Sequence, residues 1–297
     1  MTTPLTALSP LDGRYADKIA ALRPIFSEFG LMRSRVRVEV AWLLALAHAR
    51  GLHEVPDLSA DARALLTRMV EDFGEADGVR IKAIEATTNH DVKAVEYFIK
   101  EKIAAHPELD AVKEFVHFAC TSEDINNLSY ALGVRDAIQD VWLPAAQKMV
   151  DAVAAVANTV IDTPMLSRTH GQPATPTTLG KELAVFVHRL NRQLRRISAQ
   201  QYLGKINGAT GTYAAHVAAV PHANWPVIAQ DFVEGLGLTF NPLTTQIENH
   251  DWMSELYDDI ARFNQILHGF CVDVWSYISI GYFAQTPVEG ATGSSTM

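Results

Sequence analysis

The sequence has little of what marks several common classes of protein. Its 297 residues include only two cysteines, Cys120 and Cys271, which lie far apart among apolar neighbours. We therefore expect two buried free thiols, with no disulfide framework and no cysteine-based metal site. No run of about 18 apolar residues without charges occurs, so no membrane-spanning helix is predicted. The first residues lack the pattern of a signal peptide, and a soluble cytoplasmic protein is expected.

The chain is also poor in positive charge. It carries 25 lysines and arginines against 34 aspartates and glutamates, which gives a formal net charge of -9. This balance argues against a nucleic acid or an anionic membrane as the main partner. An anionic small molecule is compatible with it, because a few local arginines and lysines can set the potential of one pocket.

Signals of β-structure are nearly absent, and apolar residues instead recur at helical spacing. Between residues 28 and 50 the apolar positions at intervals of three, four and seven include Leu31, Val38, Trp42, Leu43 and Leu46. We therefore predict an all-α fold. Further helices are expected at residues 58–73, 77–86, 91–103, 111–119, 123–162, 178–202, 224–236 and 250–283. Pro144 is expected to start a new turn or to kink the run over 123–162.

These helices divide into two expected domains. Residues 1–110 are predicted to form a small N-terminal helical domain, and residues 111–297 a domain built as a long helical bundle. A helix over 250–283 would be about 50 Å long. Helices of that length in soluble proteins are typical of a long bundle or a subunit interface.

Residues 167–176 form an unusually polar stretch between two helical runs. The stretch contains His170, Arg168, an amide and three hydroxyl groups. Its two prolines and its glycine exclude a regular helix. It is either a binding or catalytic loop or a connector whose polar groups satisfy its own backbone, and composition alone favours neither.

Other polar loops share this character. Each follows or precedes an expected helix, and helix ends present free backbone N–H groups that suit carboxylates or phosphates. Thr121 also begins a sequence typical of a capping box, with carboxylates in the next turn. Together the loops indicate an anion-binding catalytic site. They lie at residues 14–15, 88–91, 121–122, 169–170, 244–246 and 293–295.

Three other features have ordinary interpretations. The glycine-rich residues 204–211 lack the residue order of a phosphate-binding P-loop, so Lys205 is interpreted as a solvated loop lysine. His90 and Asp91 are neighbours and lack metal-ligand spacing. The arginines on the polar face of the 178–202 helix are expected in solvent or in salt bridges between subunits; they are Arg189, Arg192, Arg195 and Arg196.

Several longer motifs resemble one superfamily of enzymes. Ser-Arg-Thr-His-Gly-Gln-Pro-Ala-Thr-Pro at 167–176 and Gly-Ser-Ser-Thr-Met at 293–297 resemble the fumarase/aspartase superfamily. Thr-Thr-Asn-His-Asp at 87–91, Thr-Ser-Glu-Asp-Ile-Asn-Asn at 121–127 and Ser-Pro-Leu-Asp-Gly-Arg-Tyr at 9–15 resemble its bacterial adenylosuccinate lyase family. The family's last motif continues into Pro-x-Lys-x-Asn-Pro. This chain stops at Met297, so the C-terminal part of the family fold is expected to be missing.

The resemblance implies a carbon–nitrogen lyase of purine biosynthesis. The implied reaction is β-elimination of fumarate from adenylosuccinate to give AMP, and from the succinylated aminoimidazole carboxamide ribotide. No metal or organic cofactor is implied. The implied assembly is a homotetramer whose sites are shared between subunits, with small-molecule substrates and neither nucleic acid nor membrane as partner.

The resemblance also implies roles for individual residues. His170 is the general acid, since an imidazole can supply a proton at physiological pH. Ser294 is the base, which requires strong stabilisation of its alkoxide by surrounding donors. Lys93 is a weaker candidate. The implied substrate-binding residues are Arg14, Tyr15, Asn89, His90, Asp91, Thr121, Ser122, Thr169, Gln246 and Ser295.

Two alternatives stay open. The first is another lyase of the superfamily, such as argininosuccinate lyase or fumarase, although the motifs at 9–15 and 87–91 argue against it. The second belongs to a different class, a catalytically inactive helical scaffold, because the chain stops before the family's last motif is complete.

Overall fold

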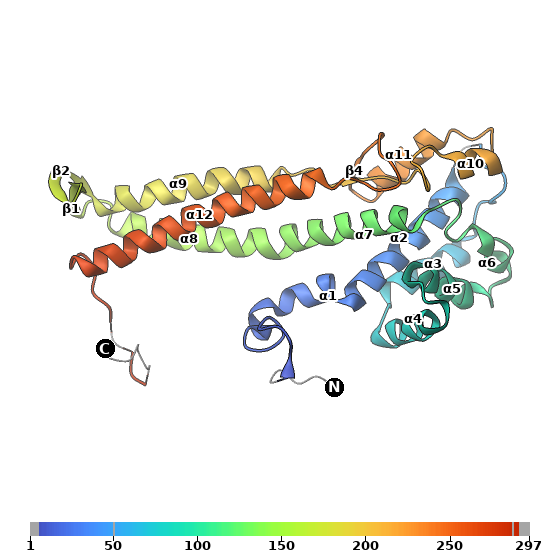
Figure 1. Ribbon diagram of the computed structural model, residues 1–297, viewed down its shortest axis with the longest axis horizontal. Helices are drawn as coiled ribbons and strands as arrows, with labels where there is room; N and C mark the ends of the chain where they lie inside the picture. Colours follow the sequence, from blue (N-terminus) through green and yellow to red (C-terminus); the bar gives the residue numbers. More distant parts are fainter. Residues whose placement is uncertain (1–5, 50, 287, 291–297) are drawn as a thin grey trace. The chain divides into compact units, whose positions relative to one another are not determined.

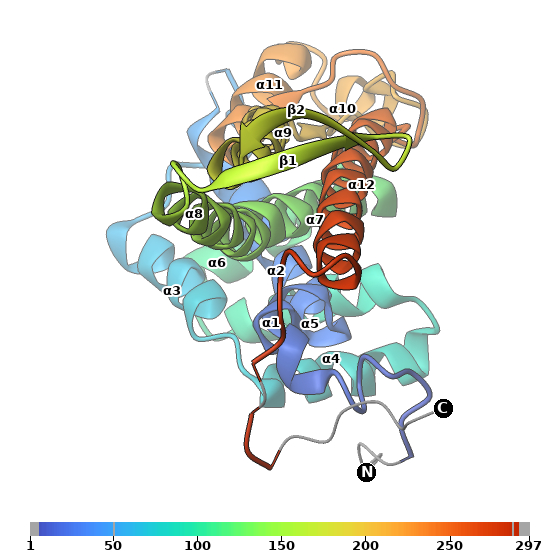
Figure 2. The same cartoon turned by 90° about the vertical axis from the view of Figure 1, so that its left-hand side faces the viewer.

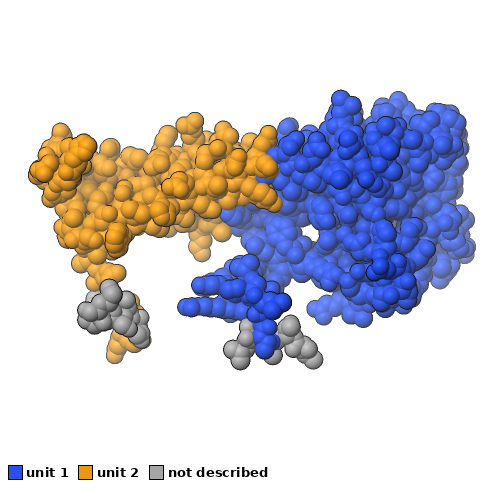
Figure 3. Space-filling view, viewed as in Figure 1, with its two compact units in different colours: residues 1–142, 201–253 blue, residues 143–200, 254–297 orange. Residues whose placement is uncertain are grey.

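The computed structural model describes residues 6–49, 51–286 and 288–290. The chain forms two compact units, shown in different colours in Figure 3. Unit 1 comprises residues 1–142 and 201–253, and unit 2 comprises residues 143–200 and 254–297. The predicted domain boundary at residue 110 follows a different division and stays a prediction.

Unit 1 is built from short and medium helices around α2. The Ser27 hydroxyl caps α2 by accepting a hydrogen bond from the Gly30 N–H at 3.1 Å. The elements of unit 1 are the 3-10 helix η2 (Ala16–Leu22), α1 (Arg23–Phe26), α2 (Glu28–His48), α3 (Ala60–Glu71), α4 (Glu75–Thr88), α5 (Asp91–Ile103), α6 (Pro107–Ala111), the 3-10 helix η3 (Lys113–Phe115), α7 (Ser122–Asp136), the π-helical η4 (Ala137–Trp142), β3 (Leu203–Gly204), α10 (Ala214–Ala219), α11 (Trp225–Gly235) and β4 (Thr239–Phe240).

The core of unit 1 surrounds α2, which packs against α1, α3, α4, α5, α7 and α11. Val36, Trp42 and Leu43 of α2 are completely buried. The burial of large apolar side chains on several faces of one helix supplies the main stabilisation of such a domain. It also explains why the two helices that carry predicted site residues at their N-termini, α5 and α7, are held against the same element.

A short parallel pair of strands joins two distant segments of unit 1. Leu203 pairs with Thr239, and Gly204 pairs with Phe240. The Asn241 N–H donates to the Gly204 carbonyl oxygen at 2.9 Å. The segment after β3 and the polar loop after β4 therefore leave this pair side by side.

Unit 2 consists of long helices and one β-hairpin. Its elements are α8 (Leu143–Thr159), β1 (Pro164–Thr169), β2 (Gln172–Thr178), α9 (Leu179–Ser198) and all but the first turn of α12 (Asp251–Ser279). Helices α8 and α9 run side by side and the hairpin connects them, as Figures 1 and 2 show. Phe186 of α9 packs on Phe270 of α12 with ring centroids 5.4 Å apart. Arg196 pairs with Asp259 at 3.0 Å.

The helical class is confirmed, and several local expectations are wrong. Residues 167–176, expected as an irregular loop, belong to the antiparallel hairpin of β1 and β2. The helix expected at 111–119 is replaced by the end of α6 and by η3, and the positive φ of His117 and Ala119 excludes a right-handed helix over the rest of the range. The helical run expected at 123–162 is observed as α7, the π-helical η4 and α8, and the irregular turn lies just before Pro144, where a new turn or a kink was expected.

The two cysteine side chains differ in their exposure to solvent. Cys120 is partly buried, and burial raises the pKa of its thiol well above the ordinary value. Cys271 is exposed in this chain, so the expectation that both are buried is wrong for Cys271. Within the residues described, no helix is long and apolar enough to cross a membrane.

Candidate active site

The N-terminus of α7 carries two predicted site residues and is closed by the expected capping box. The Thr121 N–H donates to Asp124 Oδ2 at 2.9 Å, as the capping-box pattern predicts. Thr121 and Ser122 are both partly exposed. The box therefore holds their side chains at the rim of a helix start, where free N–H groups favour anions.

Gln246 lies against this helix start. Its Nε2 donates to Thr121 Oγ1 at 3.1 Å, across a sequence separation of 125 residues. Gln246 is exposed on the loop that follows β4. Two residues that the sequence predicts as substrate-binding are thus in direct contact.

The N-terminus of α5 forms a second polar group. Asn89 ends α4 in the left-handed conformation with φ of 50°, and His90 caps α5 by accepting the Lys93 N–H at Nδ1, 3.1 Å away. Asn tolerates this conformation better than most residues. Asn89, His90 and Asp91 are all exposed. Their backbone is therefore fixed while their side chains stay accessible.

A buried arginine connects the two helix starts. Arg35 of α2 pairs with Asp91 at 2.7 Å and donates from Nε to Asn126 of α7 at 2.9 Å. Burial disfavours the charged form of Asp91, but the Arg35 charge and the Val92 N–H outweigh it, so the pKa of Asp91 is lowered. Asp91 therefore stays ionised at the α5 start, where it is paired with Arg35.

His170 and Thr169 belong to unit 2. The register pairs Thr169 with Gln172, which leaves His170 and Gly171 as a two-residue turn with φ of 52° and 76°. Positive φ at both central positions is typical of a type I′ hairpin turn, where glycine and a few polar residues are tolerated. Both predicted residues are exposed at the hairpin tip.

Arg14 and Tyr15 are separate from these groups in the described part of the chain. Arg14 and Tyr15 are exposed, and the guanidinium of Arg14 lies 5.8 Å from the Tyr15 ring centroid. In the described part of the chain, no hydrogen bond or ion pair links either of them to the other predicted residues. Ser294 and Ser295 lie outside the described residues.

Lys205 is the main functional candidate that the sequence interpretation missed. It was expected in solvent, yet its side chain is completely buried and pairs with Asp124 at 2.8 Å. An unpaired ammonium would be strongly disfavoured at such a site, so the pairing explains how the lysine can be buried. A lone lysine in a glycine-rich segment gives no such signal, because its partner lies 81 residues away.

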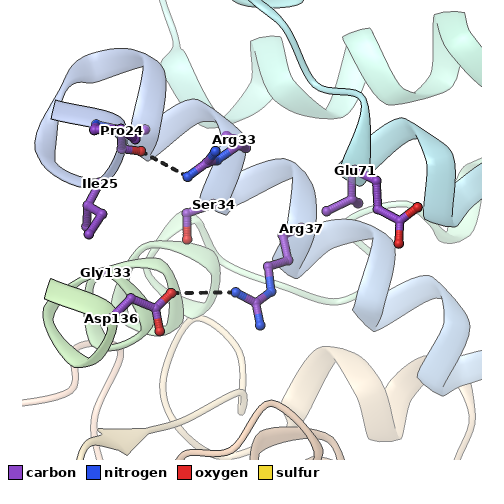
Figure 4. Close-up of a pocket in the computed structure, with 10 residues that line it drawn as sticks. Pro24, Ile25, Arg33, Ser34, Arg37, Glu71, Gly133 and Asp136 are labelled. Carbon is purple, nitrogen blue, oxygen red and sulfur yellow. Dashed lines mark hydrogen bonds and ion pairs between the residues drawn. The ribbon is translucent and has the colours of Figure 1, made fainter. Parts of the chain in front are cut away.

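A pocket of about 340 Å³ lies elsewhere in unit 1, between the starts of α1 and α2, the end of α3 and the end of α7. Figure 4 shows Arg33 bonded to the Pro24 carbonyl and Arg37 facing Asp136 at 3.8 Å. None of the predicted site residues lines this pocket. Among the residues that the structure describes, no group of three or more His, Cys, Asp or Glu side chains is placed to hold a metal.

The fold is helical, and the starts of α5 and α7 carry polar residues suited to anions. A profile of the family described as lyase matches residues 13–297, so the chain belongs to this family. The 3-carboxy-cis,cis-muconate lactonizing enzyme of Pseudomonas putida superimposes with a TM-score of 0.66 at 26% identity, covering 86% of this chain and 55% of that one. A fumarate lyase from Mesorhizobium shares the fold, with a TM-score of 0.68 at 24% identity over 88% of this chain and 57% of that one.

The chain is also similar to curated proteins at higher identity. The adenylosuccinate lyase of Escherichia coli strain K12 is 55% identical over 293 residues, which cover 99% of this chain and 64% of that protein. The adenylosuccinate lyase of Haemophilus influenzae strain Rd has the same identity and coverage. The chain thus spans 64% of the length of these relatives.

Proposed function

We propose that the protein is a carbon–nitrogen lyase that eliminates fumarate from adenylosuccinate and from the succinylated aminoimidazole carboxamide ribotide. The observation that carries the proposal is the 55% identity to adenylosuccinate lyases over 99% of the chain. The contact between Gln246 and Thr121 supports it, because it joins two predicted binding residues from distant segments.

The reaction sets three chemical requirements. A base must remove a proton from the carbon next to a carboxylate, and donors must stabilise the charge that develops there. An acid must protonate the departing nitrogen on the opposite side. In the proposal Ser294 is the base, and His170 at the exposed hairpin tip is the acid.

The polar groups of unit 1 fit the binding part of this task. Thr121, Ser122 and Gln246 offer hydroxyl and amide donors to the succinyl or base portion of the substrate, as Thr169 does from unit 2. Asn89, His90 and Asp91 line the site in the proposal, with His90 near the phosphate. The phosphate itself is assigned to Arg14 and Tyr15, because an exposed guanidinium is well suited to bidentate recognition of phosphate. Ser295 is assigned to a substrate carboxylate.

The proposal includes a homotetramer with sites shared between subunits. Helix α12 carries the exposed aromatic side chains Trp275 and Tyr257, with exposed fractions of 69% and 54%. Large apolar side chains exposed on a long helix are typical of a surface that another helix covers. The oligomeric state is measured directly by light scattering of the purified protein.

An absorbance assay of the purified protein tests the function. We expect turnover of adenylosuccinate and none of argininosuccinate. Turnover of argininosuccinate alone would assign the protein to another lyase of the superfamily. A folded assembly that converts neither substrate would instead support an inactive helical scaffold.

A further inference from the structure

The carboxylate of Asp124 has more partners than a helix cap requires. Besides the Thr121 N–H, its Oδ2 accepts the Gly208 N–H at 3.1 Å. Its Oδ1 accepts Lys205 Nζ at 2.8 Å and the Asn207 N–H at 3.0 Å. Asp124 is completely buried, as is Lys205. One carboxylate therefore binds the α7 start to the backbone of residues 205–208.

The next turn of α7 strengthens the same junction. Asn127 accepts the Lys205 N–H at Oδ1 over 2.9 Å and donates from Nδ2 to the Lys205 carbonyl oxygen over 3.1 Å. Asn127 is also completely buried. This side chain thus pairs with both backbone groups of Lys205 as a neighbouring strand would, and it fixes the height of the segment along α7.

The segment 205–208 is in turn bonded to the loop that contains Gln246. Asn207 donates from Nδ2 to Thr244 Oγ1 at 2.8 Å. Farther along the segment, Gly211 lies so close to the loop that a Cβ there would overlap the Thr244 carbonyl oxygen. Gln246 then returns to Thr121. The contacts form a closed ring from Asp124 through Asn207, Thr244 and Gln246 to Thr121.

We propose that Asp124 is a positioning residue: its buried carboxylate, neutralised by Lys205, holds the α7 start and the 244–246 loop together so that Thr121 and Gln246 present their side chains as a pair. This inference rests on the proposed function, in which Thr121 and Gln246 bind substrate. It assigns Asp124 and Lys205 no direct contact with the reacting atoms.

The charge of Asp124 matters because all its partners are donors. A carboxylate accepts on both oxygens, whereas an asparagine in its place accepts on one side and presents N–H groups on the other. In Asp124→Asn, the side-chain NH₂ therefore points at N–H donors that the second carboxylate oxygen accepted in the wild type. The ring opens at the Thr121 side or at the 205–208 side, and the 244–246 loop is no longer fixed relative to Thr121.

Two variants test the inference in the purified protein in its native assembly. Asp124→Asn breaks the ring at its anchor, and Asn207→Ala breaks only the side-chain link to Thr244 while the backbone N–H of residue 207 keeps its bond to Asp124. Thr210→Ala is the matched control, because it removes one exposed hydroxyl contact in the same segment, to Thr212, outside the ring.

The first readout is amide hydrogen exchange of residues 244–247, which needs no activity. We expect exchange to be faster by about tenfold or more in both ring variants and unchanged in Thr210→Ala. The second is steady-state kinetics with adenylosuccinate. We expect KM to rise by roughly three- to tenfold in Asn207→Ala and further in Asp124→Asn, with a smaller change in kcat, because binding of ground and transition states is weakened alike.

The outcomes separate the inference from the proposed function. If the wild-type protein does not convert adenylosuccinate, the proposed function fails, and the exchange rates alone decide whether Asp124 positions the loop. If Asp124→Asn does not fold, Asn207→Ala gives the decision. If residues 244–247 exchange at the wild-type rate in Asn207→Ala, the inference is overturned whatever the KM of that variant. Asp124 would then be a purely structural residue.

Discussion

The buried carboxylate of Glu39 and the imidazole of His117 are joined by a hydrogen bond of 2.6 Å between Oε1 and Nδ1. Glu39 lies in the centre of α2, and His117 lies four residues before Thr121. His117 and Ala119 both adopt positive φ, 61° and 56°, which is uncommon for residues with a side chain. The bond therefore fixes the segment 117–119, with its two positive φ angles, just before the α7 start.

This pair predicts a loss of stability at alkaline pH. Burial disfavours the charged imidazolium, but the hydrogen bond and charge of Glu39 outweigh it, so the pKa of His117 is raised above its ordinary value. The contribution of the pair to the unfolding free energy is complete below about pH 6.5. It is lost as pH rises through the raised pKa of His117, by at most about 1.4 kcal/mol per pH unit.

Urea unfolding at several pH values measures this loss. In His117→Gln, the decrease in unfolding free energy above about pH 6.5 should be smaller than in the wild type. In His222→Gln it should persist, because His222 is half exposed and 3.8 Å from its partner Glu54. The same decrease in both variants would contradict the assignment to His117.

Removal of the buried cation Lys205 should be far more costly than removal of an exposed one. Lys205→Met leaves the Asp124 carboxylate buried without its ammonium partner, which predicts a loss of about 3–5 kcal/mol of unfolding free energy. Lys181→Met, which breaks a pair with Glu182 on a lysine side chain that is 64% exposed, should cost less than about 1 kcal/mol. Equal urea midpoints for the two variants would show that the buried pair has no special weight.

The sequence predicts best where local chemistry decides the structure. The bounds of α5, Asp91–Ile103, follow from its apolar face, and its observed bounds agree with the predicted range. The capping box that begins at Thr121 also follows from four consecutive residues. In both cases the determining contacts are made within one or two helical turns.

The sequence predicts less where a distant partner decides. The sequence alone predicts Lys205 as a solvated loop residue, because its partner Asp124 is brought beside it only by the fold. The contact of Gln246 with Thr121 depends on the same long-range arrangement. The hairpin at the His170 turn was missed for a different reason, because its prolines and hydroxyls argue against a helix without showing the alternation of a buried strand.

The hairpin tip gives the direct test of catalysis. His170→Ala should lower turnover of adenylosuccinate by about 10²- to 10⁴-fold, the usual contribution of a general acid, while substrate binding stays measurable. His53→Ala is the control, since His53 is also exposed and is not among the predicted site residues. Stopped-flow absorbance measures turnover and calorimetry measures binding. Unchanged turnover in His170→Ala would remove His170 from the role of acid.

Gly211 should be intolerant of any side chain. Its φ is 71°, and a Cβ would overlap the carbonyl oxygens of Thr244 and Thr245. Gly211→Ala should therefore displace the 244–246 loop, lower the unfolding free energy by about 1–3 kcal/mol and raise KM.

Gly235→Ala is the matched control for this change, because nothing lies within 4 Å of its Cβ position and Gly235 sits in α11. It should leave KM unchanged and preserve or slightly raise stability, since alanine favours helix. If both glycine variants behave alike, the close approach of Gly211 to the loop does not position Gln246.

His216 predicts a loss of stability at acidic pH, opposite in sign to that of His117. The imidazole is completely buried against Trp42 and Trp225, and within the described residues neither ring nitrogen has a hydrogen-bond partner. Burial lowers the pKa of His216 to about 4, with Asp124 opposing and Lys205 assisting the shift. The native state therefore holds the neutral ring, whereas the unfolded chain takes up its proton near pH 6.5.

The unfolding free energy should accordingly fall between about pH 6.5 and pH 4, by up to about 3 kcal/mol in total. His216→Phe keeps an aromatic ring between the two tryptophans and removes the titratable nitrogens, so its stability should depend less on pH over this interval. Urea unfolding at pH 7, 6, 5 and 4.5 compares the two proteins. Parallel pH profiles would assign the acid sensitivity over this interval to groups other than His216. Asp91 is not among them, because its lowered pKa acts in the same direction only below the ordinary pKa of a carboxyl, about 3.9.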